Sequence, residues 1–238
     1  MPGWHPIGGV TVHILMRVAL VYHCRQTSHR LDETLAAAGA DVERVHLELG
    51  DPLPGTDIDR AVILGGGMGA YDVDRHPWLD LEKDWIRNLV DSGVPVLGIC
   101  LGCQLLAEVL GGKVYKAEVP EAAVVPISLT AAGEADPVVS KIGPMVYALH
   151  HDTFVLPPDA TLLAHTDRFP HAFRLGSALG LQFHPDADCD QALTWGAEEA
   201  SVLDAGGIGY DDYAQGVIAA ESQLDRTSRE IFTAWLET

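Results

Sequence analysis

Positively charged residues are scarce in this chain. Lys and Arg together number 15 among 238 residues, against 34 Asp and Glu, which gives a formal net charge of −19. The sequence pI is near 4.7. Binding to a nucleic-acid backbone requires clustered Lys and Arg that displace counterions, so we predict no nucleic-acid partner. The same shortage disfavours docking on an anionic membrane surface.

Long apolar runs are also missing, although 47% of the residues are hydrophobic. No stretch reaches the roughly 18 apolar residues that a membrane span requires. The apolar stretch Ile7–Tyr22 is interrupted by Arg17 and is preceded by no Lys or Arg, which argues against a secretory signal. The high hydrophobic content excludes a disordered chain. We expect a cytoplasmic globular protein.

Cysteine is rare as well, with four residues: Cys24, Cys100, Cys103 and Cys189. Four cysteines in a chain of this size do not form a disulfide scaffold, and no pair of CxxC motifs indicates a zinc site. A reducing compartment is the simpler interpretation. Several histidines show no spacing typical of metal ligands: His5, His23, His29, His46 and His76. We therefore predict neither a metal nor a cofactor.

Short apolar runs and helical periods alternate over the first part of the chain. Runs typical of buried strands lie at Val18–Val21, Val42–Leu47, Ala61–Leu64 and Val94–Ile99. Helices are predicted at His29–Ala38, Trp78–Leu89 and Leu101–Leu110, each followed by glycine. This alternation predicts an α/β fold, in which a mostly parallel central sheet carries helices on both faces.

The pattern changes after Lys113. Short β-rich runs without a clear helix occur at Val124–Leu129, Met145–Leu149, Leu162–His165 and Leu179–Phe183. We predict that they are antiparallel strands, added to the main sheet or folded beside it. The expected organisation is a loosely ordered extension at residues 1–15, one domain at residues 16–190, and a helical tail at residues 191–238 that packs on this domain.

A strand that runs directly into a helix carries the main chemical signal, the segment Gly98-Ile-Cys100-Leu-Gly102. It has the form of a nucleophile elbow, in which two glycines permit a sharp turn that exposes the central side chain above the sheet. The helix that begins at Leu101 directs free N–H groups and its positive dipole end at the sulfur. Both effects favour the thiolate, so we predict that Cys100 is a nucleophile.

A thiolate nucleophile needs a base, and the base needs an orienting group. His184 ends an apolar strand in the segment Leu181-Gln-Phe-His184-Pro. Asp186 follows two residues later and points to the same side of an extended chain. We predict that His184 is the base and that Asp186 orients it.

The segment Leu64-Gly-Gly-Gly-Met68 follows the predicted strand Ala61–Leu64. We predict that its glycines supply backbone hydrogen-bond donors for an oxyanion. The N–H groups of Gly67 and Leu101 are the candidates. A phosphate cradle is the weaker alternative, because neither GxGxxG nor GxxxxGK[ST] is present.

Together these segments resemble the class I glutamine amidotransferases, with a flavodoxin-like fold. The resemblance rests on four segments that occur in the same order as in the family. They are Leu64-Gly-Gly-Gly-Met, Gly-Ile-Cys100-Leu-Gly-Cys-Gln104, His150-His-Asp152-Thr-Phe and Leu-Gln-Phe-His184-Pro. The nearest likeness is to stand-alone proteins that resemble the glutaminase domain of GMP synthase. The family implies a Cys–His–Glu triad that hydrolyses the amide of glutamine through a γ-glutamyl thioester and releases ammonia.

When the family's catalytic residues are matched by position, the resemblance implies that Cys100 is the nucleophile. It implies that His184 is first the general base and then the acid that protonates the leaving ammonia. It also implies residues that bind the substrate: Gly66, Met68, Gln104, His150 and Asp152. His150 and Asp152 are expected in a loop that helps to close the glutamine pocket. Asp186 stands where the family has Glu, with Asp188 as an alternative, and Glu121–Val124 replaces the family's Glu-Ile-Gly-Trp.

Three functions remain open at this point. The first is glutamine hydrolysis that passes ammonia to a separate synthetase subunit. The second is hydrolysis of another γ-glutamyl small molecule, such as a γ-glutamyl peptide. The third is a catalytically weak binding or regulatory module of the same fold. A homodimer is compatible with each of them.

Overall fold

A computed structural model of the chain describes residues 15–26 and 28–238. The predicted extension at residues 1–15 lies outside these ranges, apart from Leu15. The strands are β1 Arg17–Tyr22, β2 Asp41–His46, β3 Arg60–Ile63, β4 Val96–Ile99, β5 Lys113–Pro126, β6 Ser128–Leu129, β7 Met145–Val155, β8 Thr161–His165, β9 Pro170–Leu175 and β10 Ala178–Leu181. The helices are α1 His29–Ala37, α2 Trp78–Asp91, α3 Leu101–Val109, α4 Ala131–Ala135, α5 Cys189–Glu198, α6 Ala200–Gly206 and α7 Tyr210–Glu237. Two 3₁₀ turns span Leu47–Leu49 and Val139–Lys141.

The central sheet has eight strands in the order β2-β1-β3-β4-β10-β9-β8-β6. The pairs from β2 to β10 are parallel, and β9, β8 and β6 add an antiparallel edge. The parallel strands are short and almost wholly apolar, as expected for strands that are covered on both faces. The prediction of a mostly parallel sheet with extra antiparallel strands is confirmed.

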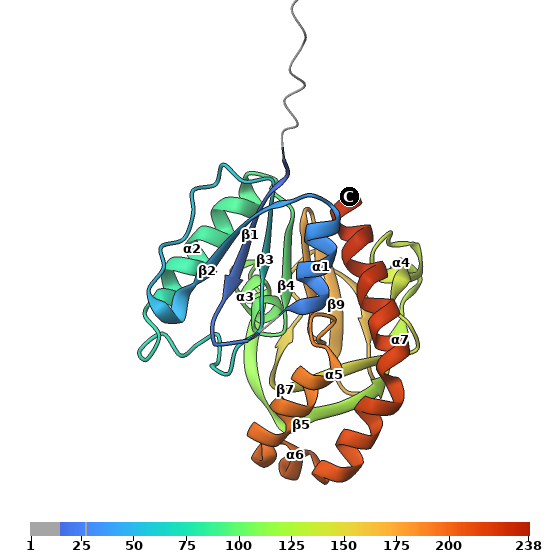
Figure 1. The fold of residues 1–238 in the computed structure, drawn as a ribbon. Helices are drawn as coiled ribbons and strands as arrows, with labels where there is room; N and C mark the ends of the chain where they lie inside the picture. The colour runs from blue at the N-terminus through green and yellow to red at the C-terminus, as the bar shows by residue number, and fades with distance from the viewer. Residues whose placement is uncertain (1–14, 27) are drawn as a thin grey trace, which may run out of the picture.

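Helices cover both faces of this sheet (Figure 1). One apolar core joins the sheet to α1 and to the end of α7, where α1 contributes Leu31 and Leu35 and α7 contributes Phe232 and Trp235. A second core joins the opposite face to α2 and α3. Within the described ranges, no helix combines the length and apolar character needed to cross a bilayer.

Of two predictions for the second half of the chain, one holds in part and one is wrong. The run Leu179–Phe183 was expected to be an antiparallel strand; β10 is antiparallel to β9 but parallel to β4. The reason is the tight β9–β10 turn at Gly176, which reverses the chain so that β10 returns in the direction of β4. A helix is also present where none was expected, because the Thr130 side chain accepts a hydrogen bond from Gly133 N–H and caps α4.

The long strands β5 and β7 form a separate two-stranded antiparallel sheet. It packs with α5, α6 and the first half of α7 in a third apolar core. Arg30, which is 4% exposed, links this region to the main domain, because its guanidinium donates to the Ala187 carbonyl at 2.6 Å and to Glu221 on α7 at 2.7 Å. The C-terminal helices therefore pack against both sheets.

Candidate active site

The elbow predicted around Cys100 is present. β4 ends at Ile99, α3 begins at Leu101, and Cys100 between them has φ of +51°, a left-handed value that is rare outside glycine. A Cβ at Gly98 would collide with the Gly102 carbonyl, and a Cβ at Gly102 with the Ile63 carbonyl. Glycine is therefore required on both sides of the cysteine.

The Cys100 side chain lies at the N-terminus of α3 and lines a cavity of about 600 Å³. Its Sγ is 4.0 Å from the carbonyl oxygen of Leu149 on β7. The first-turn N–H groups of a helix stabilise negative charge at this position. Burial raises the pKa of Cys24 to about 11 and the pKa of Cys103 well above its ordinary value, so neither thiol is activated.

His184 lies three residues beyond β10 and lines the same cavity. Its backbone N–H donates to the Tyr147 carbonyl at 2.9 Å. Its Nδ1 is 3.2 Å from Oδ1 of Asp186, which is fully buried. Asp188, the alternative acid, is engaged elsewhere: it caps α5 through Gln191 N–H and accepts from His29 at 2.8 Å.

The charge environment of His184 favours its protonated form. Burial by itself lowers the pKa of His184, but the negative charges of the Cys100 thiolate and Asp186, with hydrogen bonds to both, raise it to about 10. Because Nδ1 is held by Asp186, Nε2 remains for Cys100. The arrangement places a protonated imidazole between the sulfur of Cys100 and the carboxylate of Asp186.

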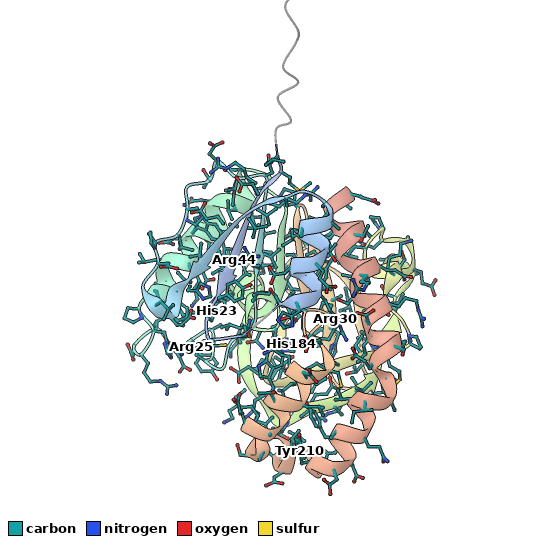
Figure 2. All side chains as sticks on the ribbon, in the orientation of Figure 1. His23, Arg25, Arg30, Arg44, His184 and Tyr210 are labelled. Carbon is teal, nitrogen blue, oxygen red and sulfur yellow. The ribbon has the colours of Figure 1, made fainter. Side chains whose placement is uncertain are left out.

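An aromatic wall around His184 has no signal in the sequence. Trp195 on α5 lies with its ring centroid 4.9 Å from that of His184, and Tyr147 on β7 lies at 5.9 Å. Figure 2 shows His184 at the junction between the main sheet and the C-terminal helices. Trp195 was missed because only the folding of α5 over the cavity brings it there.

The glycine segment after β3 runs beside these groups. A Cβ at Gly65 would lie 2.9 Å from Cε1 of His184, so only glycine leaves room for the ring. Gly66, Gly67 and Met68 line the cavity, as predicted for residues near an oxyanion or a substrate. Leu101, the other predicted donor, begins α3 directly after Cys100.

A fully buried ion pair lies behind this glycine segment. Nε2 of His23 is 2.9 Å from Glu82 on α2, and Nδ1 is 3.0 Å from the Gly65 carbonyl. A carbonyl only accepts hydrogen bonds, so Nδ1 carries a proton, and the carboxylate on the other side requires a second proton on Nε2. Burial lowers the pKa of His23, but the charge of Glu82 outweighs this effect and raises it. The geometry and the raised pKa both favour an imidazolium, whose Nδ1 donates to the Gly65 carbonyl.

The expectation of a closing loop at His150 and Asp152 is wrong, because both residues lie within strand β7. Cross-strand pairing with β5 gives this segment regular geometry: His150 is opposite Glu121 and Asp152 is opposite Lys116. Both side chains still line the cavity, as does Gln104.

Gln104 is mostly engaged inside the protein. Its Nε2 donates to the Asp152 carbonyl at 3.0 Å and to Oε1 of Gln182 at 3.2 Å. Both side-chain N–H groups are used in this way, so Oε1 is the atom of Gln104 that is left for a ligand.

The cavity also has walls that the sequence patterns did not indicate. They include both charge signs and come from several elements: Arg25, Tyr71, Arg75, Lys116, Glu198, Glu199 and Val202. Ala122, Ala123 and Val124, which replace the family's Ile-Gly-Trp, are not among the described residues that line it. Among the described residues, the donor atoms of Glu121, His150 and His171 lie close enough together to share a metal ion.

Comparison with known proteins agrees with this geometry. The profile of the family described as glutamine amidotransferase class-I matches residues 19–193. One subunit of the glutamine-hydrolysing GMP synthase of Sulfolobus acidocaldarius is 29% identical over 182 residues, covering 72% of this chain and 89% of its own length. The corresponding GMP synthase subunit from Sulfurisphaera tokodaii is 30% identical over 181 residues, with the same coverage of both chains.

A solved structure shows the same fold. The structure of a glutamine amidotransferase from Thermotoga maritima superimposes with a TM-score of 0.82 at 25% sequence identity. The match covers 95% of this chain and 100% of that one, so the similarity extends over the C-terminal helices as well.

Proposed function

This chain belongs to the class I glutamine amidotransferase family, and from that membership we propose that it hydrolyses the side-chain amide of glutamine through a thioester on Cys100. The observation that carries the proposal is the meeting of two separate segments at one cavity. Cys100 on its strained elbow and His184, held by Asp186, both line it.

The first half-reaction is acyl transfer to sulfur. The Cys100 thiolate attacks the amide carbon, and the N–H groups of Gly67 and Leu101 stabilise the negative oxygen of the tetrahedral intermediate. His184 donates its Nε2 proton to the leaving nitrogen, the C–N bond breaks, and ammonia departs. The product is a γ-glutamyl thioester and a neutral imidazole.

The second half-reaction hydrolyses this thioester. Neutral His184 removes a proton from a water molecule, and the resulting hydroxide attacks the thioester carbon. Collapse of the intermediate breaks the C–S bond, so glutamate leaves and the thiolate is restored beside the imidazolium. Asp186 keeps the ring in one orientation throughout.

The released ammonia goes, we propose, to a separate synthetase subunit. Two relatives are named as one subunit of a glutamine-hydrolysing GMP synthase, a name that implies a further subunit. The chain spans 89% of the length of both relatives. A synthetase partner would take up the ammonia before it mixes with solvent.

The direct test is glutamate release from glutamine by pure protein, with Cys100→Ala as the control. Glutamate formation by the wild-type protein and its loss in Cys100→Ala support the proposal. Equal rates in the two proteins would contradict it.

A larger γ-glutamyl compound is the second candidate substrate. The cavity volume of about 600 Å³ lies in the range of roughly 300–1,000 Å³ typical of pockets for drug-sized ligands. This is more space than one free amino acid needs. A higher kcat/KM for γ-glutamyl peptides than for glutamine would favour this candidate.

The reactivity of the Cys100 thiol distinguishes the proposed enzyme from a noncatalytic module of the same fold. Because burial raises the pKa of Cys24, Cys103 and Cys189, iodoacetamide at pH 7 should label Cys100 before the other three cysteines. Mass mapping of peptides from the labelled protein measures the order of labelling. Uniform slow labelling of all four cysteines would favour the module.

A further inference from the structure

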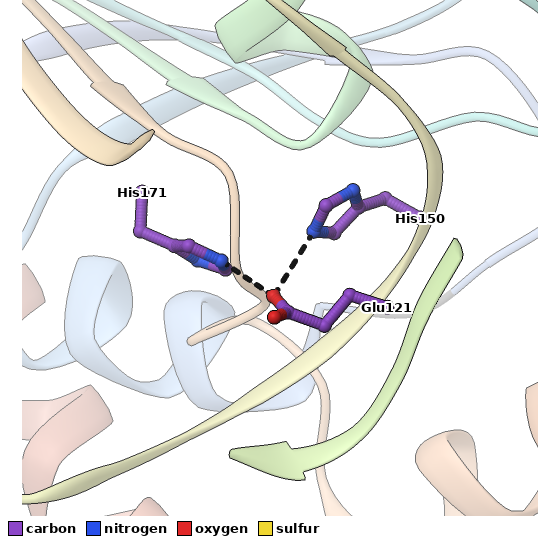
Figure 3. A group of neighbouring side chains, drawn as sticks. All are labelled: Glu121, His150 and His171. Atoms are coloured by element: carbon purple, nitrogen blue, oxygen red, sulfur yellow. Dashed lines mark hydrogen bonds and ion pairs between the residues drawn. The ribbon is translucent and has the colours of Figure 1, made fainter. Parts of the chain in front are cut away.

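Three buried side chains from three strands meet behind the wall of the cavity (Figure 3). They are Glu121 on β5, His150 on β7 and His171 on β9, and each is at most 5% exposed. Their nearest donor atoms all lie within 4.8 Å of one another. Nε2 of His171 is 2.6 Å and Nε2 of His150 is 3.4 Å from Oε2 of Glu121.

Two ring nitrogens of this cluster, Nε2 of His150 and Nδ1 of His171, have no hydrogen-bond partner among the described residues. Nδ1 of His150 faces the Asp152 carbonyl at 3.0 Å, and since a carbonyl only accepts, Nδ1 carries the proton. In the neutral ring the lone pair is then on Nε2, which is buried and makes no hydrogen bond to any described residue. This lone pair faces the carboxylate of Glu121 at 3.4 Å, an arrangement that is unfavourable and that either a proton on Nε2 or a metal ion bound to both groups would relieve.

We propose that Glu121, His150 and His171 bind one divalent first-row transition metal ion, with zinc as the best match to the donor set. Two imidazole nitrogens and one carboxylate are a common zinc donor set, whereas calcium and magnesium prefer oxygen ligands alone. The ligands are Nε2 of His150, Nε2 of His171 and Oε2 of Glu121, and water completes the tetrahedron.

The surroundings have the features of a metal site's outer shell. Histidine ligands usually donate their other N–H to a carbonyl or carboxylate, as His150 does to Asp152, and ligating carboxylates are themselves hydrogen-bonded. The remaining oxygen of Glu121 accepts from the Thr166 hydroxyl at 3.1 Å. When the metal binds, the His171 proton moves to Nδ1, which has no acceptor among the described residues, so His171 lacks the outer-shell partner that His150 has, and the metal–ligand bonds must offset this cost.

The donor atoms lie within 4.8 Å of one another, so side-chain movements are needed to reach the spacing of a bound ion. Tetrahedral zinc with bonds of about 2.0–2.1 Å places its ligand atoms roughly 3.3 Å apart. The His150–Glu121 separation of 3.4 Å already fits, whereas the His171–Glu121 separation of 2.6 Å must open.

A metal here would join the β5–β7 sheet to β9 of the main sheet and would fix the ring of His150. That ring lines the cavity and holds the Asp152 carbonyl, which also accepts from Gln104. The ion would therefore position one wall of the cavity without contacting the reacting atoms.

Metal binding can be measured without activity. We would use full-length Cys100→Ser protein freed of metal by chelation, so that the reactive thiol does not bind the probe. Titration with Co²⁺ should produce d–d absorption bands that saturate at one equivalent, and Zn²⁺ should displace the Co²⁺. Glu121→Gln and His171→Gln should weaken Zn²⁺ binding by more than about 100-fold, and loss of the Thr166 hydroxyl in Thr166→Val by about 10-fold.

Two controls keep the test decisive. His29→Gln, at an exposed histidine outside the cluster, should leave Zn²⁺ affinity unchanged. X-ray absorption of the zinc-loaded Cys100→Ser protein, which lacks the reactive thiol, should show only nitrogen and oxygen ligands. Absence of one-equivalent binding, a sulfur ligand in the spectrum, or folded Glu121→Gln and His171→Gln variants with unchanged affinity would each overturn the proposal.

Discussion

Trp195 on α5 packs against the ring of His184, with planes inclined at 58° and centroids 4.9 Å apart. The residue comes from the C-terminal helices, so these helices form part of the cavity as well as a cover for the sheets. An aromatic ring in this position limits the rotation of the imidazole that the proposed mechanism requires to face Cys100.

Replacing this ring should therefore affect the chemical step. We expect Trp195→Ala to lower kcat for glutamine by about 10- to 100-fold, because a small misplacement of the base is costly. Trp195→Phe should keep most of the activity. Thr194→Ala, at the exposed neighbouring position on α5, is the control and should match the wild type. Equal kcat for Trp195→Ala and Thr194→Ala would show that the ring does not position His184.

The acid that orients His184 is the subject of a second prediction. Asp186→Asn should lower kcat by roughly 10²- to 10⁴-fold with little change in KM, because an amide no longer fixes the ring or stabilises its charge. Asp188→Asn keeps an oxygen that can cap α5, so it should leave kcat within about threefold and change the stability by less than about 0.5 kcal/mol. A larger loss of kcat in Asp188→Asn than in Asp186→Asn would reverse the assignment.

The protonation of His184 gives a third prediction. Its pKa near 10 depends on the Cys100 thiolate and Asp186, which overcome the opposing effect of burial. The ring should therefore remain protonated from pH 7 to pH 9 in the resting wild-type protein. Cys100→Ala removes one negative charge but leaves the ring buried, so the pKa should fall. Titration of the His184 Cε1 proton by NMR measures both values, and the same titration midpoint in the two proteins would contradict the ion pair.

The buried His23–Glu82 pair gives a fourth prediction. Glu82→Gln leaves a charged ring buried without its partner and should cost about 3–5 kcal/mol of unfolding free energy near pH 6. The folded-state pKa of His23 is raised, so its contribution is complete below the unfolded value of about 6.5 and is lost as pH rises through the folded value. The stability difference between wild type and Glu82→Gln should therefore narrow towards pH 9.

Urea unfolding at pH 6 and pH 9 measures this difference. Asp84→Asn, at an exposed acidic position on the same helix, is the control and should change stability by less than about 0.5 kcal/mol at either pH. A difference that widens with pH would show that His23 is neutral in the folded protein.

Local features of the chain allowed its elbow to be predicted. The sequence Gly98-Ile-Cys100-Leu-Gly102 contains the two glycines that the turn requires, and the glycines after β3 are needed where the chain passes His184. Helices α1, α2 and α3 followed from the spacing of apolar residues, since this spacing reports directly which face is buried.

Features that depend on distant segments could not be predicted in this way. The direction of β10 depends on the turn at Gly176, and the position of Asp152 depends on the pairing of β7 with β5. The His23–Glu82 pair joins the residue that follows β1 to α2, and no local pattern distinguishes these two residues from ordinary surface polarity.

The order of residues along the chain was enough to predict the layered α/β architecture and to single out Cys100 as the proposed nucleophile, because turns and amphipathic periods arise within a few neighbouring residues. Only the tertiary structure decided the rest of the surroundings of Cys100 and His184. Trp195 reaches His184 only when α5 folds over the cavity, and Glu121 reaches His171 only when β5 and β9 are brought together. Both events are driven by the burial of apolar surface between segments that lie far apart in the sequence, and no local pattern specifies which segments meet.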